Sequence, residues 1–137
     1  MGDIQDNYEG DLMKIPKAPM PFGYWWAMYT DKVKGDAGFK KFEHLFFEPE
    51  YGFMTWSLNP ECTILTIHKA AGDGKYWMDK AYGMFELGKK QYGLKKLRVC
   101  TVRNPEAFAR RFGGEVYKTE ERNGQKVYWL ETTEVKE

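Results

Sequence analysis

The apolar positions in the middle of the chain change from a strand-like to a helix-like spacing. Residues 62–68 are rich in β-branched side chains, which favour a pleated backbone. After two nearby glycines, apolar residues recur at three- and four-residue intervals, as on one face of a helix. We therefore predict a strand over residues 62–68, a glycine-containing loop over 69–75 and a helix over 76–92 that ends at Gly93.

The chain before this unit predicts a leader, a helix and two strands. Residues 1–21 are acidic and contain three closely spaced prolines, so we expect an extended segment. The aromatic stripe and the following glycine predict a helix over 22–33. Residues 42–48 alternate as a strand, although their phenylalanines also fit a helix face, and 53–58 follow after a turn. We expect these two strands to form an antiparallel meander with strand 62–68.

The chain after Gly93 predicts a strand, a short helix and a hairpin. Leu97 and Val99 alternate with polar residues, which indicates a half-buried strand over 96–102. Asn104 followed by a proline is a typical helix start, and we expect this helix to run to Phe112.

The last two strands are predicted over 115–122 and 125–133, joined by Asn123-Gly124. That two-residue turn sets a cross-strand register. The expected pairs are Glu121 with Lys126, Thr119 with Tyr128, and Tyr117 with Leu130.

Length and composition fit one domain over residues 1–137 with an apolar core. The 137 residues are 42% apolar and 17% aromatic. Cys62 and Cys100 fall inside predicted strands, so we expect buried free thiols in a reducing compartment, with a disulfide between them as the alternative. No apolar run approaches the length of a membrane span, and the acidic N-terminus is unlike a signal peptide. We expect a soluble, cytoplasmic protein.

The net charge of +1 conceals a basic run over residues 89–111, where the only acid is Glu106. This run is either a solvated face or a patch that binds a phosphorylated ligand or nucleic acid. Nucleic acid fits less well, because the whole chain is nearly neutral and its aromatic residues lie at core spacings. Two histidines and two scattered cysteines give no metal-binding spacing.

A glycine loop that leads into a helix presents backbone N–H groups at the positive end of the helix dipole. Such a site suits a phosphate or diphosphate. The same arrangement also occurs in α/β connections that bind nothing.

The order of elements resembles the GCN5-related N-acetyltransferase (GNAT) superfamily, and two motifs carry the resemblance. The run Lys69-Ala70-Ala71-Gly72-Asp73-Gly74 is similar to the family's acyl-CoA diphosphate loop, Gln/Arg-x-x-Gly-x-Gly/Ala. Asn104, Ala107 and Phe112-Gly113 are similar to its later Asn, Ala and aromatic-Gly motif. The likeness covers about residues 42–133.

The resemblance implies an α/β fold with a mixed, mostly antiparallel sheet flanked by helices, and acetyl-CoA or another acyl-CoA as cofactor. The diphosphate would lie on the N–H groups of residues 71–75, and the pantetheine arm would lie between strands 64–68 and 96–102, which splay apart in the family. The basic run, with Arg103, would meet the adenosine phosphate. The cofactor-binding residues so implied are Ile67, Lys69, Ala70, Ala71, Gly72, Asp73, Gly74, Lys75, Asn104, Arg110 and Arg111.

The sequence also departs from the family pattern. The carboxylate of Asp73 would oppose a bound diphosphate, or would cap the helix itself. The family's general-acid Tyr is replaced by Ala109 or Arg110.

The catalytic candidates are His68 as a base and Tyr117 as an acid. His68 also fits a structural role, and Tyr117 also fits a buried strand position. Cys100 lacks a predicted His neighbour and is interpreted as core. Carboxylates near strand ends are further base candidates: Glu48, Glu50 and Glu61.

Two functional hypotheses follow. One is an acyl-CoA-dependent N-acetyltransferase that acts on a small-molecule or protein amine. The other is a non-catalytic GNAT-fold interaction protein that binds a protein partner or self-assembles. Residues 97–130 also resemble small GNAT-like virion proteins of short-tailed phages, which would place the second kind of protein in a virion.

Overall fold

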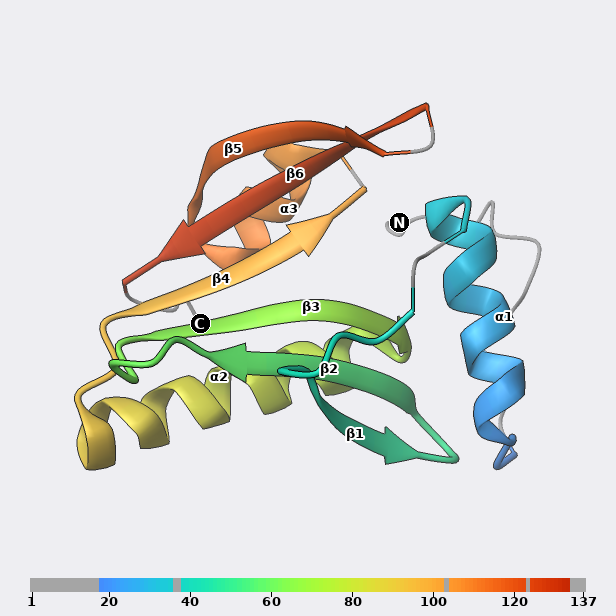
Figure 1. Ribbon diagram of the computed structural model, residues 1–137, viewed down its shortest axis with the longest axis horizontal. Helices are drawn as coiled ribbons and strands as arrows, with labels where there is room; N and C mark the ends of the chain where they lie inside the picture. The colour runs from blue at the N-terminus through green and yellow to red at the C-terminus, as the bar shows by residue number, and fades with distance from the viewer. Residues whose placement is uncertain (1–17, 36–37, 103, 123, 134–137) are drawn as a thin grey trace.

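The computed structural model describes residues 18–35, 38–102, 104–122 and 124–133. These residues form three helices and six strands (Figure 1). The elements are α1 (Phe22–Val33), β1 (His44–Glu48), β2 (Gly52–Leu58), β3 (Ile64–Gly72), α2 (Gly74–Tyr92), β4 (Lys96–Thr101), α3 (Pro105–Phe112), β5 (Glu115–Arg122) and β6 (Gln125–Thr132).

The strands form one six-stranded sheet in the order β1-β2-β3-β4-β6-β5. The neighbours β3 and β4 run parallel, and the other four pairs of neighbours run antiparallel. The fold is therefore α/β with a mixed, mostly antiparallel sheet flanked by helices, as expected from the sequence.

Helices α2 and α3 cover one face of the sheet, behind it in Figure 1, and α1 packs on the other. The adjacent β2 residues Phe53 and Met54 show this, because neighbouring strand residues point to opposite faces. Met54 belongs to the cluster of α2 and α3, and Phe53 packs with Trp25 and Tyr29 of α1. The larger cluster comprises Met54, Leu65, Ile67, Trp77, Ala81, Phe85, Leu94, Leu97, Val99, Phe112 and Leu130.

Strand β3 begins and ends later than the predicted strand over 62–68, so the predicted loop over 69–75 is wrong. Cys62 lies in the preceding turn with φ 58°, and not in a strand. The Asn59 side-chain oxygen accepts hydrogen bonds from the N–H groups of Thr63 and Ile64, both at 2.8 Å, which holds that turn. At the other end the strand continues to Gly72, and the connection to α2 shrinks to Asp73.

Gly72 faces Gly52 of β2 across an unusually close backbone contact. Their φ angles are 105° and 108°, in the region that favours glycine. A Cβ at Gly72 would lie 2.1 Å from the carbonyl oxygen of Tyr51, so no larger residue fits. The packing of β2 against β3 therefore accounts for this glycine without a ligand.

The helices agree more closely with their predictions. Helix α1 has the predicted bounds, and α2 begins two residues earlier than expected and ends at Gly93 (φ 77°). Asn104 caps α3, since its side-chain oxygen accepts from the N–H groups of Glu106 and Ala107 at 2.8 and 3.2 Å. No helix in the described part of the chain is long and apolar enough to cross a membrane.

The terminal hairpin has the expected register near its turn and a different one farther away. Glu121 pairs with Lys126 and Thr119 with Tyr128, as predicted. The predicted pair of Tyr117 with Leu130 is wrong, because the register shifts between Val116 and Lys118. Tyr117 is the extra residue of this bulge. Asn123 of the predicted turn lies outside the described residues.

Candidate functional site

The parallel strands β3 and β4 pair along only part of their length. Their register runs from Ile64 opposite Lys96 to Ile67 opposite Val99. Beyond these residues, β3 continues to Gly72 beside β2, and β4 continues to Thr101 beside β6. The two strands therefore diverge after Ile67 and Val99 (Figure 1). This separation matches the splayed strands that the resemblance implies.

A bulge in β3 lies where the strands diverge. Thr55 of β2 pairs with Lys69, and the next residue, Trp56, pairs with Ile67. His68 is therefore the extra residue, and a bulge of this kind bends the strand that carries it. The bend turns the end of β3 away from β4 and places the His68 side chain at the point of divergence.

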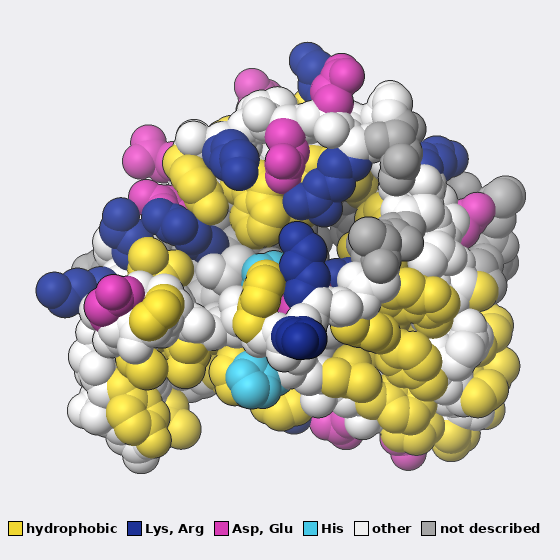
Figure 2. All heavy atoms as spheres, in the orientation of Figure 1, with side chains coloured by type: hydrophobic (Ala, Val, Ile, Leu, Met, Phe, Trp, Pro, Cys, Tyr) yellow, Lys and Arg dark blue, Asp and Glu magenta, His cyan; other side chains and the backbone are white. Residues whose placement is uncertain are grey.

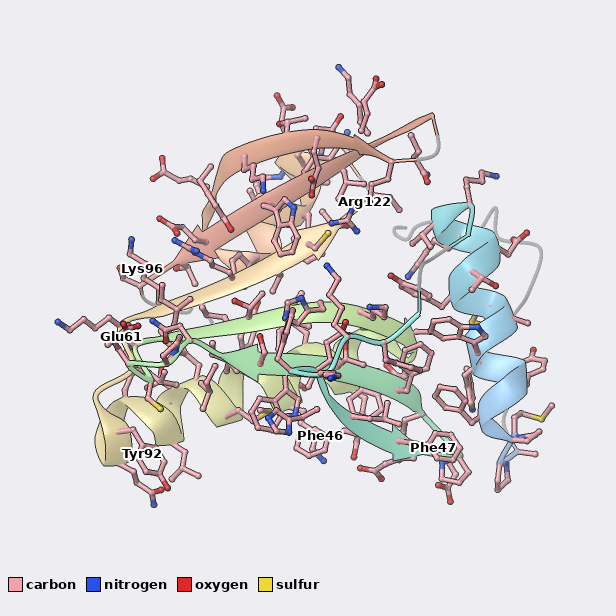
Figure 3. All side chains as sticks on the ribbon, in the orientation of Figure 1. Phe46, Phe47, Glu61, Tyr92, Lys96 and Arg122 are labelled. Atoms are coloured by element: carbon pink, nitrogen blue, oxygen red, sulfur yellow. The ribbon has the colours of Figure 1, made fainter. Side chains whose placement is uncertain are left out.

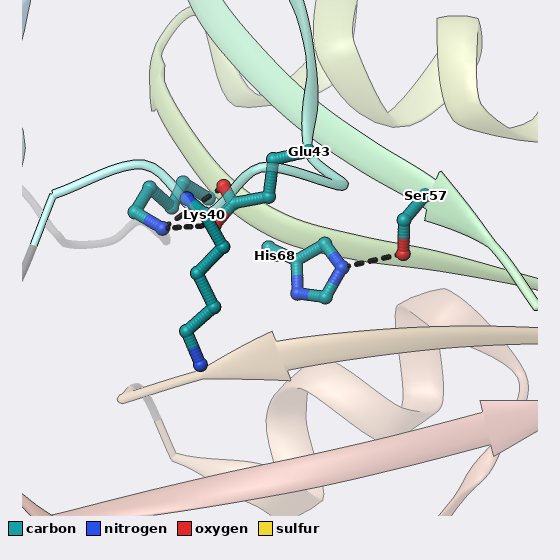
Figure 4. A network of polar contacts seen from close by, with 5 residues as sticks. Lys40, Glu43, Ser57 and His68 are labelled. Atoms are coloured by element: carbon teal, nitrogen blue, oxygen red, sulfur yellow. Dashed lines mark hydrogen bonds and ion pairs between the residues drawn. The ribbon is translucent and has the colours of Figure 1, made fainter.

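His68 is held between polar and aromatic neighbours. Its Nε2 lies 2.7 Å from Oγ of Ser57 (Figure 4). The ring centroids of Phe42 and Trp129 lie 5.5 and 6.4 Å from that of the imidazole. Figure 4 also shows Lys40, which reaches from the segment before β1 toward β4.

Burial is the largest influence on the pKa of His68, and it lowers the pKa below the ordinary 6.5. The charge of Glu43 opposes this shift, and the charges of Lys69, Lys40 and Arg122 add to it. The imidazole is therefore neutral near neutral pH. A neutral imidazole can accept a proton, which is the property a general base needs.

Lys69, predicted to contact the cofactor, forms a buried ion pair instead. Its Nζ lies 2.9 Å from both carboxylate oxygens of Glu43, and the two side chains are 7% and 1% exposed. The Lys69 ammonium also lies 5.6 Å from the centre of the Phe39 ring. This ion pair holds the segment of residues 38–43, which precedes β1, against β3 beside His68 (Figure 4).

The predicted diphosphate site at the start of α2 is partly filled by the chain itself. The Asp73 side chain accepts a hydrogen bond from the N–H of Tyr76 at 3.1 Å, which confirms the helix-cap alternative. Ala71 and Gly72 pair with β2, so their predicted place in a phosphate loop is wrong. Ala70 packs against the core. Gly74 and Lys75 are exposed at the helix start, with a side-chain pair between Lys75 and Asp79 at 2.8 Å.

The turn between β1 and β2 supports the same end of α2. The carbonyl of Tyr51 accepts from the backbone N–H of Asp73 at 2.9 Å and from the Trp77 indole at 2.8 Å. The rings of Tyr51 and Tyr76 stack with centroids 3.9 Å apart. The Tyr76 hydroxyl donates to Glu48, which also pairs with Lys80. Contacts within the chain therefore hold the start of α2 in place.

The later candidates are spread over the α3 region. Asn104 is occupied as the cap of α3. Arg110 is exposed on that helix, while the side chain of Arg111 and the whole of Arg103 lie outside the described residues.

The two predicted catalytic residues lie on different strands. His68 lies on β3 and Tyr117 on β5, three strand positions away in the sheet. At about 4.8 Å per strand their backbones are about 14 Å apart. Tyr117 instead lies under the Arg98 guanidinium, 4.7 Å from its ring centre. Burial raises the pKa of Tyr117 above 10.

Cys100 also departs from its expected place in the core. It is half-buried on β4 opposite Trp129. Its strand neighbours Val99 and Thr101 are the buried ones. Cys100 therefore lies on the face opposite α2 and α3, with Trp129.

The sequence did not reveal several residues around His68. These are Lys40, Phe42, Glu43, Ser57, Arg122 and Trp129. They come from distant parts of the chain, and no local motif links them.

No protein-family model matches the sequence, and no curated protein matches it. The fold is similar to that of several solved structures. A GNAT family acetyltransferase from Elizabethkingia anophelis with acetyl-CoA bound is 14% identical, with a TM-score of 0.43, over 67% of this chain and 76% of that one.

Two further structures are similar at comparable levels. An acetyltransferase from Thermus thermophilus is 15% identical, with a TM-score of 0.49, over 89% of this chain and 98% of that one. An acetyltransferase from Bacillus cereus is 17% identical, with a TM-score of 0.43, over 80% and 82%.

Proposed function

We propose that this protein is a GNAT-type acyl-CoA-binding N-acyltransferase. The observation that carries the proposal is the divergence of β3 from β4 directly at the His68 bulge. The β3–β4 ladder ends at Ile67 and Val99, and an extended chain that pairs with strand edges would enter beyond that point. The element order and the position of α2 agree with the implied family.

The residues present fit an acyl-CoA only in part. Backbone groups of β3 and β4 beyond their paired stretch would hold the pantetheine arm. Gly74 and Lys75 would meet the diphosphate at the positive end of α2, and the exposed Arg110 would meet the adenosine phosphate. The Asp73 carboxylate opposes that diphosphate, and we expect it to weaken binding.

When bound, an acyl-CoA supplies a thioester carbonyl at which a C–N bond to an amine forms while the C–S bond breaks. The task of His68 is to take the proton that the amine loses. The hydrogen bond to Ser57 fixes the imidazole ring, and in the tautomer whose Nε2–H donates to Ser57 Oγ, the lone pair of Nδ1 takes the proton of the amine. The departing thiolate takes its proton from water.

The His68→Gln variant tests the base. We expect its acyl-transfer rate to fall by about 10²–10⁴-fold, measured as free thiol released from acetyl-CoA with a panel of amines. Because the pKa of His68 is lowered, the wild-type rate should rise with pH below 6.5 and level off near neutrality. The variant should lack this rise. A variant with the wild-type rate and pH profile would remove His68 from the mechanism.

The Asp73→Ser variant tests the carboxylate at the α2 start. Serine also caps helices, so stability should change by less than about 1 kcal/mol, while loss of the charge should tighten acetyl-CoA binding severalfold. Glu86→Ser, an exposed carboxylate farther along the same helix, is the control and should change affinity less. Equal affinities in all three proteins would place the diphosphate elsewhere.

The alternative, a non-catalytic interaction protein, is favoured by a different observation. Apolar side chains before and on the edge strand β1 are exposed: Phe39 (45%), Phe42 (53%), Leu45 (47%) and Phe47 (37%). Figure 2 shows apolar side chains gathered over α1 and the β1–β2 region. Concentration-dependent assembly in light scattering, with no heat from acetyl-CoA, would favour this function.

A further inference from the structure

The face of the sheet opposite α2 and α3 carries aromatic and basic side chains beside the His68 bulge. On β5 and β6, the strand register places Trp129 opposite Lys118, and Arg122 opposite Gln125. Lys and Arg side chains gather near the middle of this face in Figure 2.

Trp129 is the centre of this group. The Lys118 ammonium and the Arg122 guanidinium lie 6.0 and 5.8 Å from its ring centre. Glu120 accepts from the Trp129 indole at 2.7 Å and from Arg122 at 2.9 Å, which fixes both side chains. Arg122, labelled in Figure 3, is therefore held over an aromatic ring that itself faces His68.

Lys40 approaches His68 from the other side. Lys40 belongs to the segment that the Glu43–Lys69 ion pair holds against β3. The residue is exposed, and its side chain extends toward β4 (Figure 4). The charges of Lys40 and Arg122 both act on the His68 imidazole. Glu43 is paired with Lys69 and Glu120 with Arg122, so among the described residues Lys40 and Lys118 add positive charge here beyond these two pairs.

We propose that the acyl acceptor is a small amine that also bears an anionic group, a carboxylate or a phosphate, bound by Lys40 and Arg122. Phe42 and Trp129, whose ring centroids lie 5.5 and 6.4 Å from that of the imidazole, would contact the acceptor's carbon chain. The amine nitrogen then lies at His68, which takes its proton. This inference rests on the proposed acyltransferase function, and it names the substrate class.

The kinetic test compares matched acceptors that differ in the anion. With acetyl-CoA as donor, 4-aminobutyrate should exceed butylamine, and phosphoethanolamine should exceed ethanolamine, each by at least about tenfold in kcat/KM. The stronger of the two preferences identifies the anion as carboxylate or phosphate. Equal rates within both pairs would overturn the proposal.

The variants locate the anion site. Lys40→Gln should lower the preference for the anionic acceptor by about tenfold, and Arg122→Lys should lower it less than Arg122→Gln. Lys126→Gln is the control, because Lys126 lies on the same hairpin but alternates onto the face of Tyr128, which packs toward α2 and α3. If Lys126→Gln lowers the preference for the anionic acceptor as much as Lys40→Gln does, the proposed anion site is wrong.

Binding without acyl-CoA gives an independent readout. Butyrate and inorganic phosphate, titrated separately into the protein, should change tryptophan fluorescence saturably for the anion that fits, and Trp129→Phe should remove the signal. Lys40→Gln should weaken that titration, and Lys126→Gln should not. Failure of both titrations with acetyl-CoA binding intact would overturn this inference alone, whereas failure of acetyl-CoA binding would overturn the proposed function.

Discussion

Replacing Gly72 by alanine is expected to lower the free energy of unfolding by about 2–5 kcal/mol. The alanine would have to adopt a φ of 105°, which costs about 1–2 kcal/mol. Its Cβ would also lie 2.1 Å from the Tyr51 carbonyl oxygen, so that β2 and β3 must move apart, at a further cost of about 1–3 kcal/mol. Urea denaturation followed by tryptophan fluorescence measures this loss.

Gly74→Ala is the matched control for that prediction. A Cβ at Gly74 meets nothing within 4 Å, and the residue is the first of α2. Alanine there should leave stability unchanged or raise it by up to about 1 kcal/mol. Equal stability of the two variants would show that the contact between Gly72 and Tyr51 is not as close as described.

Removing one partner of the buried pair should have a comparable effect. Glu43→Gln is expected to cost about 3–5 kcal/mol, because it leaves the Lys69 ammonium buried without its counter-charge. Glu86→Gln breaks an exposed pair with Lys89 at 3.5 Å and should cost less than about 1 kcal/mol. Urea midpoints of the two variants give the comparison, and an equal cost would contradict the burial of the Glu43–Lys69 pair.

The same pair predicts a pH dependence of stability. Burial raises the pKa of Glu43, but hydrogen bonds from Lys69 and the Lys40 backbone outweigh it and hold the pKa below 4.5. Because the pKa is lower in the folded state, this contribution is complete above the unfolded value. It is lost as pH falls through the folded pKa. Glu43→Gln should therefore lose stability less steeply on acidification than the wild type does.

Local signals in the sequence predicted the helices well. The Asn104 cap, the proline after it and Gly93 act within one helical turn, so α3 begins and α2 ends where these residues indicate. The antiparallel meander and the turn end of the last hairpin also follow from short-range patterns.

Long-range pairing explains the errors. Glycines signal a loop and a close strand contact equally well, and only the approach of Tyr51 shows that Gly72 serves the second purpose. The bulges at His68 and Tyr117 shift the register by one residue without a local sequence signal. Each was therefore visible only in the structure.

The candidate site was predictable only through His68. Its environment depends on residues far along the chain, since Ser57 is 11 positions away and the Glu43–Lys69 pair spans 26. The sequence motif instead predicted a cofactor-binding loop over residues 69–74. Most of these residues pair in the sheet, pack in the core or cap the helix.

Calorimetric titration of acetyl-CoA into the wild-type protein near neutral pH tests the central claim most directly. If the divergent ends of β3 and β4 receive an acyl-CoA, the titration should show one-to-one binding with a micromolar Kd. Arg110→Glu should weaken that binding. A titration without heat up to millimolar acetyl-CoA, from protein shown to be folded by its urea transition, would contradict the account.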